Sequence, residues 1–337
     1  MLTQRLWLSE PESCATEQKM TENSVSDALK RFRQDLPTKA RVYVAGCSGE
    51  PLALVDALAQ DPALAAGVPF LGIWIPGVNQ TDWASYSASA RAESIFVSPA
   101  LRPSFEAGRT KFMPLSYVQS TRWLSNTALD GGIIMVTPPD ANGEVSLGVS
   151  ADFSTLISDR PDLPLLAVIN HAMTPPMNGP KIALDRFKHI AEVDQALVQV
   201  PEASLPETFE VIGANIANLC ASGDTLQFGL GNVQQAVLKA LVGHQDLKIH
   251  AGMVSNPLVG LLDSGGIADQ RNAIVTGVAI GTDALYQRVV REDRIQFAPV
   301  THTHAISTLA GIENFKAINS CIEVDLFGQA NAEFSKR

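Results

Sequence analysis

Short apolar runs separated by longer mixed stretches recur along most of the chain. The runs are four to eight residues long and are rich in Val, Ile, Leu and Ala, which is typical of strands buried on both faces of a sheet. The stretches between them are long enough for crossover helices, so the pattern predicts parallel sheets. The strands that we expect span residues 41–45, 70–75, 132–136, 165–169, 225–228, 248–254 and 273–280.

One unit of this pattern occurs twice. Residues 24–58 can be laid on residues 207–241, and each copy reads as a helix, a strand, a glycine turn and a second helix. The turn is Gly46-Cys47-Ser48-Gly49 in the first copy and Gly229-Leu230-Gly231-Asn232 in the second. Strand, turn and helix units recur in many α/β folds, so chance similarity is the alternative to a duplication.

The length of 337 residues is more than one ordinary core needs and predicts two domains. Pro201 and Pro206 mark a break between the two copies of the repeat. We therefore expect a mobile leader over residues 1–23, an N-terminal α/β domain over residues 24–200 and a C-terminal α/β domain over residues 201–337.

Composition narrows the function classes. A hydrophobic share of 46% with 18% charged residues is typical of a globular protein, and the net charge of −10 disfavours a nucleic-acid partner. The four cysteines lack CxxC spacing, which predicts neither a zinc site nor a disulfide framework and favours a cytoplasmic setting. No apolar window approaches 18 residues, so we expect no membrane segment.

The second glycine turn is the first candidate for a ligand site. In an open parallel sheet, ligands bind at the carboxyl ends of strands, where helix N-termini offer unpaired N–H groups to anions. The turn lacks the Gly-Lys-Ser/Thr ending of a phosphate-binding P-loop, and Gln234 stands at the third glycine position of the dinucleotide fingerprint. A tight turn without a ligand is the equally weighted alternative.

Two other patterns carry little chemistry. His302 and His304 would share one face if their segment were a strand, but no further ligand has suitable spacing, so we predict no metal site. No Gly-x-Ser-x-Gly elbow occurs, because Gly46-Cys47-Ser48-Gly49 is one residue too short.

Several longer stretches, taken in order, resemble the acetyl-CoA hydrolase/transferase family, and most closely its acetate, butyrate and 4-hydroxybutyrate CoA-transferases. Residues 137–150 resemble the family's SPPDxxGxxSLGxS loop, and residues 225–233 resemble its TLQxGIGxI strand and turn. The other matching stretches are residues 98–102, residues 244–250, which resemble HKDLGIH, and residues 318–329, which resemble INSAIEVDLTGQ.

The resemblance implies a fold, a chemistry and a site. The fold is α/β, with two related open, mostly parallel sheet domains of the CoA-transferase (NagB/RpiA-like) type. A family glutamate attacks the acyl-CoA thioester, becomes an acyl anhydride and then a glutamyl-CoA thioester, and passes CoA to a carboxylate. Backbone N–H groups at the glycine turn would stabilise the oxyanion. By resemblance, the residues that contact CoA are Gly229, Leu230, Gly231, Asn232, Val233, Met253, Asn319, Gly328 and Gln329.

The chain departs from the family at the nucleophile. The family's IHSEM or IHTEM segment corresponds here to residues 249–253, and Gly252 stands where the glutamate is expected. No carboxylate lies between Asp246 and Asp263, so a small shift of register cannot supply one. Glu323 and Glu333 are the nearest substitutes, although the place of Glu323 in the family pattern favours a structural role.

Three hypotheses follow. The chain is a CoA-transferase or acyl-CoA hydrolase whose carboxylate comes from elsewhere, a weakened paralogue that binds acyl-CoA, or a subunit that pairs with another chain. The family continues beyond the stretch ending at Gln329, so the C-terminal domain is expected to be short and to be covered by oligomerisation or a partner. The expected ligands are acyl-CoA and a small carboxylate, with no permanently bound cofactor. The sequence does not indicate the acyl group.

Overall fold

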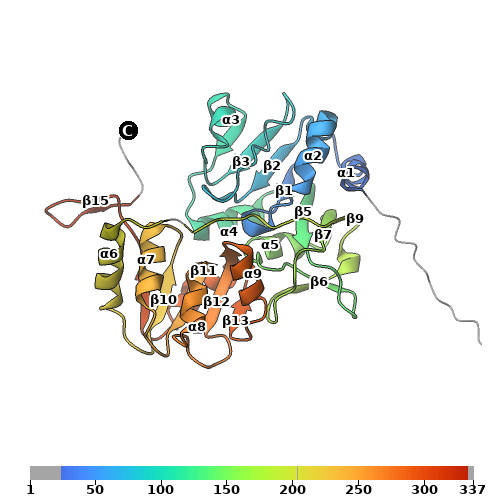
Figure 1. Ribbon diagram of the computed structural model, residues 1–337. Helices are drawn as coiled ribbons and strands as arrows, with labels where there is room; N and C mark the ends of the chain where they lie inside the picture. The colour runs from blue at the N-terminus through green and yellow to red at the C-terminus, as the bar shows by residue number, and fades with distance from the viewer. Residues whose placement is uncertain (1–23, 203, 333–337) are drawn as a thin grey trace, which may run out of the picture.

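Two parallel sheets form the framework of the computed structural model, which describes residues 24–202 and 204–332. Figure 1 shows one sheet in each of two lobes, with the chain passing from the upper lobe to the lower one near residue 200. The expected leader over residues 1–23 lies outside the described residues.

The first lobe contains a seven-stranded sheet in the order β4-β3-β2-β1-β5-β7-β9, in which neighbouring strands are parallel. Its strands are β1 Val42–Val44, β2 Pro69–Gly72, β3 Arg91–Ser94, β4 Thr110–Phe112, β5 Gly131–Val136, β7 Leu165–Asn170 and β9 His189–Val193. Its helices are α1 Val25–Gln34, α2 Ala53–Gln60, α3 Arg102–Glu106, α4 Tyr117–Asn126 and α5 Ser154–Ser158, and β6 Glu144–Ser146 pairs with β8 Lys181–Ala183 as an antiparallel ribbon.

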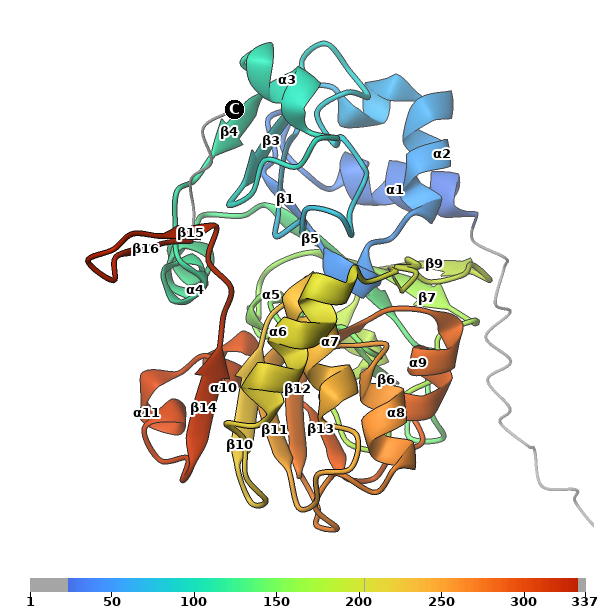
Figure 2. The same ribbon diagram turned by 60° about the vertical axis from the view of Figure 1, so that its left-hand side comes forward.

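The second lobe contains a five-stranded parallel sheet in the order β13-β12-β11-β10-β14. Its strands are β10 Thr225–Phe228, β11 Lys248–Ser255, β12 Ile274–Ile280, β13 Ile295–Phe297 and β14 Phe315–Ile318. Its helices are α6 Glu207–Ala217, α7 Asn232–Ala240, α8 Leu258–Asp263, α9 Asp283–Val289, α10 Val300–Thr303 and α11 Ile306–Leu309. A hairpin of β15 Glu323–Val324 and β16 Ala330–Asn331 projects from the side of the molecule in both views (Figures 1 and 2).

The fold predicted from the apolar runs is confirmed, because both sheets are open and parallel. The predicted strand over residues 225–228 coincides with β10, and those over residues 132–136, 165–169, 248–254 and 273–280 differ from β5, β7, β11 and β12 by at most a residue at each end. The predicted strand over residues 70–75 was too long, since β2 ends at Gly72. The two copies of the repeat follow the same order, α1-β1-turn-α2 and α6-β10-turn-α7.

Residues 302–304 do not form a strand, so the condition under which His302 and His304 would share one face is not met. Pro299 precedes one helical turn, α10, and the backbone N–H groups of Thr303 and His304 return to the carbonyls of Pro299 and Val300. His302 and His304 therefore face different neighbours, namely His250 for the first and Tyr117 for the second.

Residues 149–152 join the two lobes. They run antiparallel to the C-terminal half of β12. The N–H of Ala151 donates to the Gly277 carbonyl, and the N–H of Ala279 donates to the Val149 carbonyl, both at 2.9 Å. The Ser48 hydroxyl adds a bond of 2.8 Å to the Ala279 carbonyl. This segment begins with the last two residues of the SLGxS-like stretch, so the end of that motif forms part of the seam between the lobes.

No helix within residues 24–202 and 204–332 combines the length and apolarity needed to cross a bilayer. In the same part of the chain, His, Cys, Asp and Glu side chains form no cluster of three or more that could hold a metal ion.

Candidate functional site

The second glycine turn lies between the end of β10 and the start of α7. Gly231 is the N-cap of α7 and has a φ of +130°, a backbone conformation that L side chains rarely adopt. A Cβ at this position would also stand 2.9 Å from the Oε1 of Gln234. The first N–H groups of α7 have no partners within their own helix, so the turn presents donors at the carboxyl edge of the sheet.

A pocket of about 220 Å³ opens beside this turn and draws its walls from both lobes. Gly77 and Val78 follow β2, Val200 belongs to the segment between the lobes, and Asn256 follows β11. Asn256 fixes this arrangement, because its Nδ2 donates to the Val200 carbonyl at 3.0 Å and its Oδ1 accepts from the Thr282 N–H at 2.8 Å. Carboxyl ends of strands from both sheets thus meet at one pocket.

The floor of the pocket is apolar, and the carboxylate that lines the pocket is paired with a lysine. Val78 and Ile280 belong to a buried cluster against which Leu230 and Met253 pack. Glu202 also lines the pocket, and the Lys239 ammonium lies 2.5 Å from its carboxylate. An anion at this turn would therefore face backbone N–H groups without an unpaired carboxylate opposing it.

Gly252 and Met253 point to opposite faces of β11, because side chains alternate along a strand. Met253 packs toward the pocket floor, whereas Gly252 faces α10. The predicted site residues are therefore divided between the two faces of the sheet.

Three glycines lie side by side on the Gly252 face. β11 pairs with β12 so that Gly252 is opposite Gly277, and the register of β10 with β11, continued past Leu226 and Ile249, brings Gly229 level with Gly252. Parallel strands lie about 4.8 Å apart, so this glycine row, Gly229, Gly252 and Gly277, is about 10 Å long. The pairing of Phe228 with Ile318 places Asn319 at its outer end, next to Gly229.

The His304 imidazole occupies the space in front of Gly252. An ideal Cβ on Gly252 would lie 2.5 Å from the Cε1 and 3.0 Å from the Nε2 of His304. The Nδ1 of His304 is 2.9 Å from the Thr303 hydroxyl, and that hydroxyl donates to the Pro299 carbonyl at 3.5 Å. Burial, and secondarily the neighbouring His250, lower the pKa of His304 to about 4, so the ring is neutral at physiological pH.

Asp152 covers the Gly277 end of the row. Its side chain is 3% exposed, and its Oδ1 lies 3.2 Å from the position of an ideal Cβ on Gly277. The Tyr117 hydroxyl donates to Oδ2 at 2.8 Å, while Oδ1 has no hydrogen-bond partner among the described residues. Burial raises the pKa of this carboxyl to about 7, against the lowering effect of the Tyr117 bond.

Tyr117 links the two groups. Its ring centroid is 4.7 Å from that of His304, and its hydroxyl reaches Asp152. Tyr117 is the first residue of α4, whose start is fixed by a capping box: the Gln119 N–H donates to the Ser116 hydroxyl and the Gln119 side chain accepts from the Ser116 N–H. The Ser-x-x-Gln signature in the sequence thus positions Tyr117.

Asn232 also lines the pocket, and Val233 is partly buried against the hydrophobic core. The other three predicted residues lie in the hairpin, and Glu333 lies outside the described residues. Glu323 is exposed, and its Oε1 accepts from the Asn331 side chain at 2.9 Å across the hairpin. Gly328 and Gln329 are also exposed at the hairpin turn, where the Gln329 N–H donates to Asp325. The roles of Glu323, Gly328 and Gln329 in the site stay predictions.

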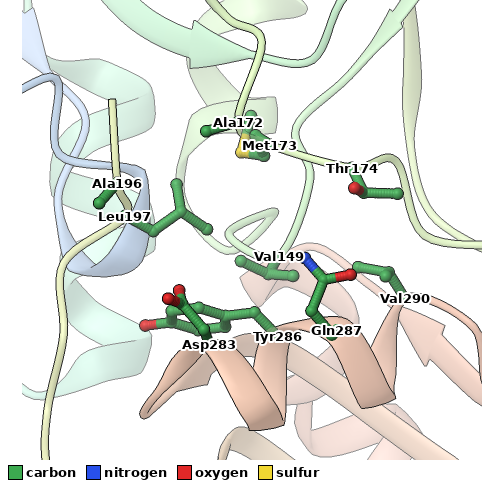
Figure 3. A pocket seen from close by; sticks show the side chains of 10 residues that line it. All are labelled: Val149, Ala172, Met173, Thr174, Ala196, Leu197, Asp283, Tyr286, Gln287 and Val290. Atoms are coloured by element: carbon green, nitrogen blue, oxygen red, sulfur yellow. The ribbon is translucent and has the colours of Figure 1, made fainter. Parts of the chain in front are cut away.

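A larger cavity, about 300 Å³, lies on another part of the seam. Figure 3 shows Met173 and Leu197 facing Tyr286 and Gln287 of α9 across it. The Tyr286 hydroxyl donates to the Val198 carbonyl at 2.6 Å, which fixes its ring as one wall. The glycine turn does not line this cavity.

Sequence reasoning missed Tyr117, Asp152 and His304 as site residues. The sequence does show His302 and His304 as a pair, but only the helical turn of α10 reveals that they face different neighbours. Asp152 comes two residues after the SLGxS-like stretch, so a search for acidic residues beside that motif would have found it.

Two domain models of one protein family match this chain. A model of the acetyl-CoA hydrolase/transferase N-terminal domain matches residues 26–205, which is just over half of the chain, and a model of the C-terminal domain of that family matches residues 281–337. The glycine turn and Gly252 lie between the two matched regions.

Individual relatives agree with the family models. The chain is 27% identical over 301 residues to a 4-hydroxybutyrate coenzyme A transferase of Clostridium kluyveri, covering 87% of this chain and 70% of that protein. It spans 47–56% of the length of four further curated relatives.

Solved structures share the fold. A 4-hydroxybutyrate CoA-transferase of Porphyromonas gingivalis superposes with a TM-score of 0.72 at 25% identity, over 90% of this chain and 74% of that one. RipA of Yersinia pestis superposes with a TM-score of 0.80 at 23% identity, over 91% of this chain and 75% of that one, which is a likeness of fold.

Proposed function

Because the chain belongs to the acetyl-CoA hydrolase/transferase family, we propose that it binds acyl-CoA thioesters at the glycine turn after β10 and acts on them as a CoA-transferase or acyl-CoA hydrolase. The main support is the position of the Gly231 turn, at the carboxyl edge of the sheet and beside a pocket that both lobes line. In this proposal the pocket takes the pantetheine arm, and the nucleotide stays outside, because about 220 Å³ is small for a whole cofactor.

The turn connects the pocket with the glycine row. Gly231 lines the pocket, and Gly229, two residues earlier, is the outer member of the row and has nothing within 4 Å of its ideal Cβ position. An arm that follows the turn would bring the thioester over backbone that lacks side chains. Glycines in strands permit such close approach of a ligand.

Short acyl groups and a small carboxylate are the proposed substrates. The similar proteins are named for 4-hydroxybutyrate, and for butyryl-CoA with acetate. We extend that class, without a choice among its members, to this chain.

Gly252 supports a second candidate function, binding of acyl-CoA without CoA transfer. A glycine has no group that can form an acyl anhydride, and the position is filled by His304. Trapping decides between the two. The chain is incubated with acetyl-CoA, treated with borohydride or hydroxylamine, and mapped by mass spectrometry. An adduct on Glu323 would support transfer through a substitute carboxylate, and the absence of any carboxylate adduct would exclude it.

The Gly231→Ala variant is expected to bind CoA at least about tenfold more weakly, or about 1.4 kcal/mol. The added Cβ is strained at a φ of +130° and pushes against Gln234, so the N–H groups of the turn move. Calorimetric titration with CoA measures the effect.

Gly243→Ala is the matched control for this experiment. Gly243 has a φ of +109° and no atom within 4 Å of its ideal Cβ, and it follows the other end of α7. It should bind CoA like the wild type. Equal affinities in both variants would contradict the placement of CoA at the turn.

A further inference from the structure

The cavity in Figure 3 is separate from the glycine turn, and it lies where α/β proteins bind ligands. One wall is formed by residues 172–174 and 196–197, which follow the carboxyl ends of the neighbouring strands β7 and β9. The other wall is α9, which follows β12 of the second lobe. We propose that this cavity binds a small organic cation, namely an ammonium group on an apolar body.

The interior of the cavity is apolar. One face of α9 and its C-cap turns toward the first lobe, because the residues there that line the cavity are spaced three or four apart: Asp283, Tyr286, Gln287 and Val290. A volume of about 300 Å³ has room for an organic ligand of about 10–15 non-hydrogen atoms. The apolar and aromatic side chains of the interior are each less than a tenth exposed: Val149, Met173, Leu197, Tyr286 and Val290.

Asp283 provides the charge of the cavity. Its backbone N–H donates to the Oε1 of Gln199 at 3.1 Å and its Oδ1 accepts from the Nε2 of Gln199 at 2.7 Å, which fixes the carboxylate at one end of the cavity (Figure 3). Its Oδ2 has no hydrogen-bond partner among the described residues, and no described Lys, Arg or His pairs with it. None of the described residues that line the cavity is basic. A cation is therefore attracted to this end, and a carboxylate or a phosphate is repelled.

Arg291 does not cancel this charge. Its Nη2 donates to the Oε1 of Gln287 at 3.4 Å, and Arg291 does not line the cavity. The Thr174 hydroxyl lies at the end of the cavity away from Asp283 (Figure 3). The Asp283 carboxylate is therefore the group that discriminates between ligands by charge.

Three probes with the same apolar body test the preference for a cation: 4-phenylbutylammonium, 4-phenylbutan-1-ol and 4-phenylbutyrate. Titration calorimetry on the full chain measures the affinity of each. The ammonium should bind about three- to fivefold more tightly than the alcohol, which is the range for an ion pair that water reaches, and the carboxylate should bind more weakly than the alcohol. The methyl NMR signal of Met173 should shift with the same dissociation constant, because that side chain lines the cavity.

Asp283→Asn tests the carboxylate. The variant keeps the size of the side chain and an oxygen that accepts from Gln199, so it should lower the affinity for the ammonium to that for the alcohol and leave the alcohol unchanged. Glu207→Gln is the matched control, because Glu207 is the first residue of α6, as Asp283 is of α9, and it does not line the cavity. It should keep the preference for the ammonium.

Ala196→Phe tests the cavity. Ala196 lines the cavity and is exposed, so the added ring should fill the space from the rim and abolish binding of all three probes, with a melting temperature near wild type. Ala284→Phe is the matched control, because Ala284 is an exposed alanine of α9 that does not line the cavity. It should bind the probes like the wild type.

Each contrary outcome overturns a stated part of the proposal. Equal affinities for the ammonium and the alcohol, or tighter binding of the carboxylate, would overturn the cationic class of ligand. Wild-type affinities in Ala196→Phe would place the probes outside the cavity, and a Met173 signal that no probe shifts would reject the site. The proposed CoA site is unaffected by these outcomes, because the glycine turn does not line this cavity.

Discussion

The double variant Gly252→Glu with His304→Ala is expected to form a covalent CoA adduct on residue 252 that neither single variant forms. The mechanism implied by the family requires a carboxylate at this position, and a Cβ there would lie 2.5 Å from the His304 ring. The glutamate alone therefore meets an occupied space, and the alanine alone provides no nucleophile. With both changes, CoA transfer from acetyl-CoA to a carboxylate should rise at least about 100-fold over Gly252→Glu, or about 2.7 kcal/mol of activation free energy.

Mass mapping of the borohydride-treated protein locates the adduct, and an acetyl-CoA to butyrate exchange assay gives the rate. A matched double variant with Gly252→Gln has the same bulk and no carboxylate, so it should form no adduct. An adduct-free Gly252→Glu, His304→Ala protein that still folds and binds CoA would mean that the site lacks more than its nucleophile.

Replacing Asp152 by asparagine is expected to remove a loss of stability that the wild type shows as the pH rises from acidic to neutral values. The carboxyl ionises near pH 3.8 in the unfolded chain and near pH 7 in the folded one, because burial disfavours the charge. Between these values the folded state keeps a proton that the unfolded state has released, so its stability falls as the pH rises. From pH 5 to pH 8 the free energy of unfolding should fall by about 3 kcal/mol on account of this one group.

Urea unfolding of wild type and Asp152→Asn at pH 5 and pH 8 measures the difference in slope. The variant is compared with itself at the two pH values, which cancels the constant effect of burying an amide. Asp56→Asn changes an exposed carboxylate of α2 and should keep the wild-type dependence. If Asp152→Asn shows the same fall as the wild type, the carboxyl is not the source.

The central strands of both sheets were predictable because they are short apolar runs that need only local pattern to recognise. The outer strands β3, β4, β9, β13 and β14 carry polar side chains and were not predicted. β10, β11 and β12 were all found in this way, and so was the glycine turn between β10 and α7. Family motifs then located Gly252, since its neighbours His250 and Met253 fit the pattern on either side.

The cluster around Gly252 could not be predicted, because its members come together only through tertiary contacts. Tyr117, Asp152 and His304 lie on α4, the seam segment and the end of α10, far apart in the chain. The glycine row is equally hidden, since it depends on the register between strands. The division of Gly252 and Met253 between two faces follows from strand alternation and could have been foreseen from the sequence.

The contact between His304 and the backbone of Gly252 has an evolutionary consequence. A glutamate at position 252 and this imidazole compete for the same space, so the fitness effect of a substitution at either position depends on the residue at the other. A glutamate at position 252 is accommodated only if the imidazole moves or is replaced, so a second substitution at position 304 should raise its benefit. The residues at positions 252 and 304 should therefore vary together, and homologues should combine glutamate at the first with histidine at the second less often than independent variation would give.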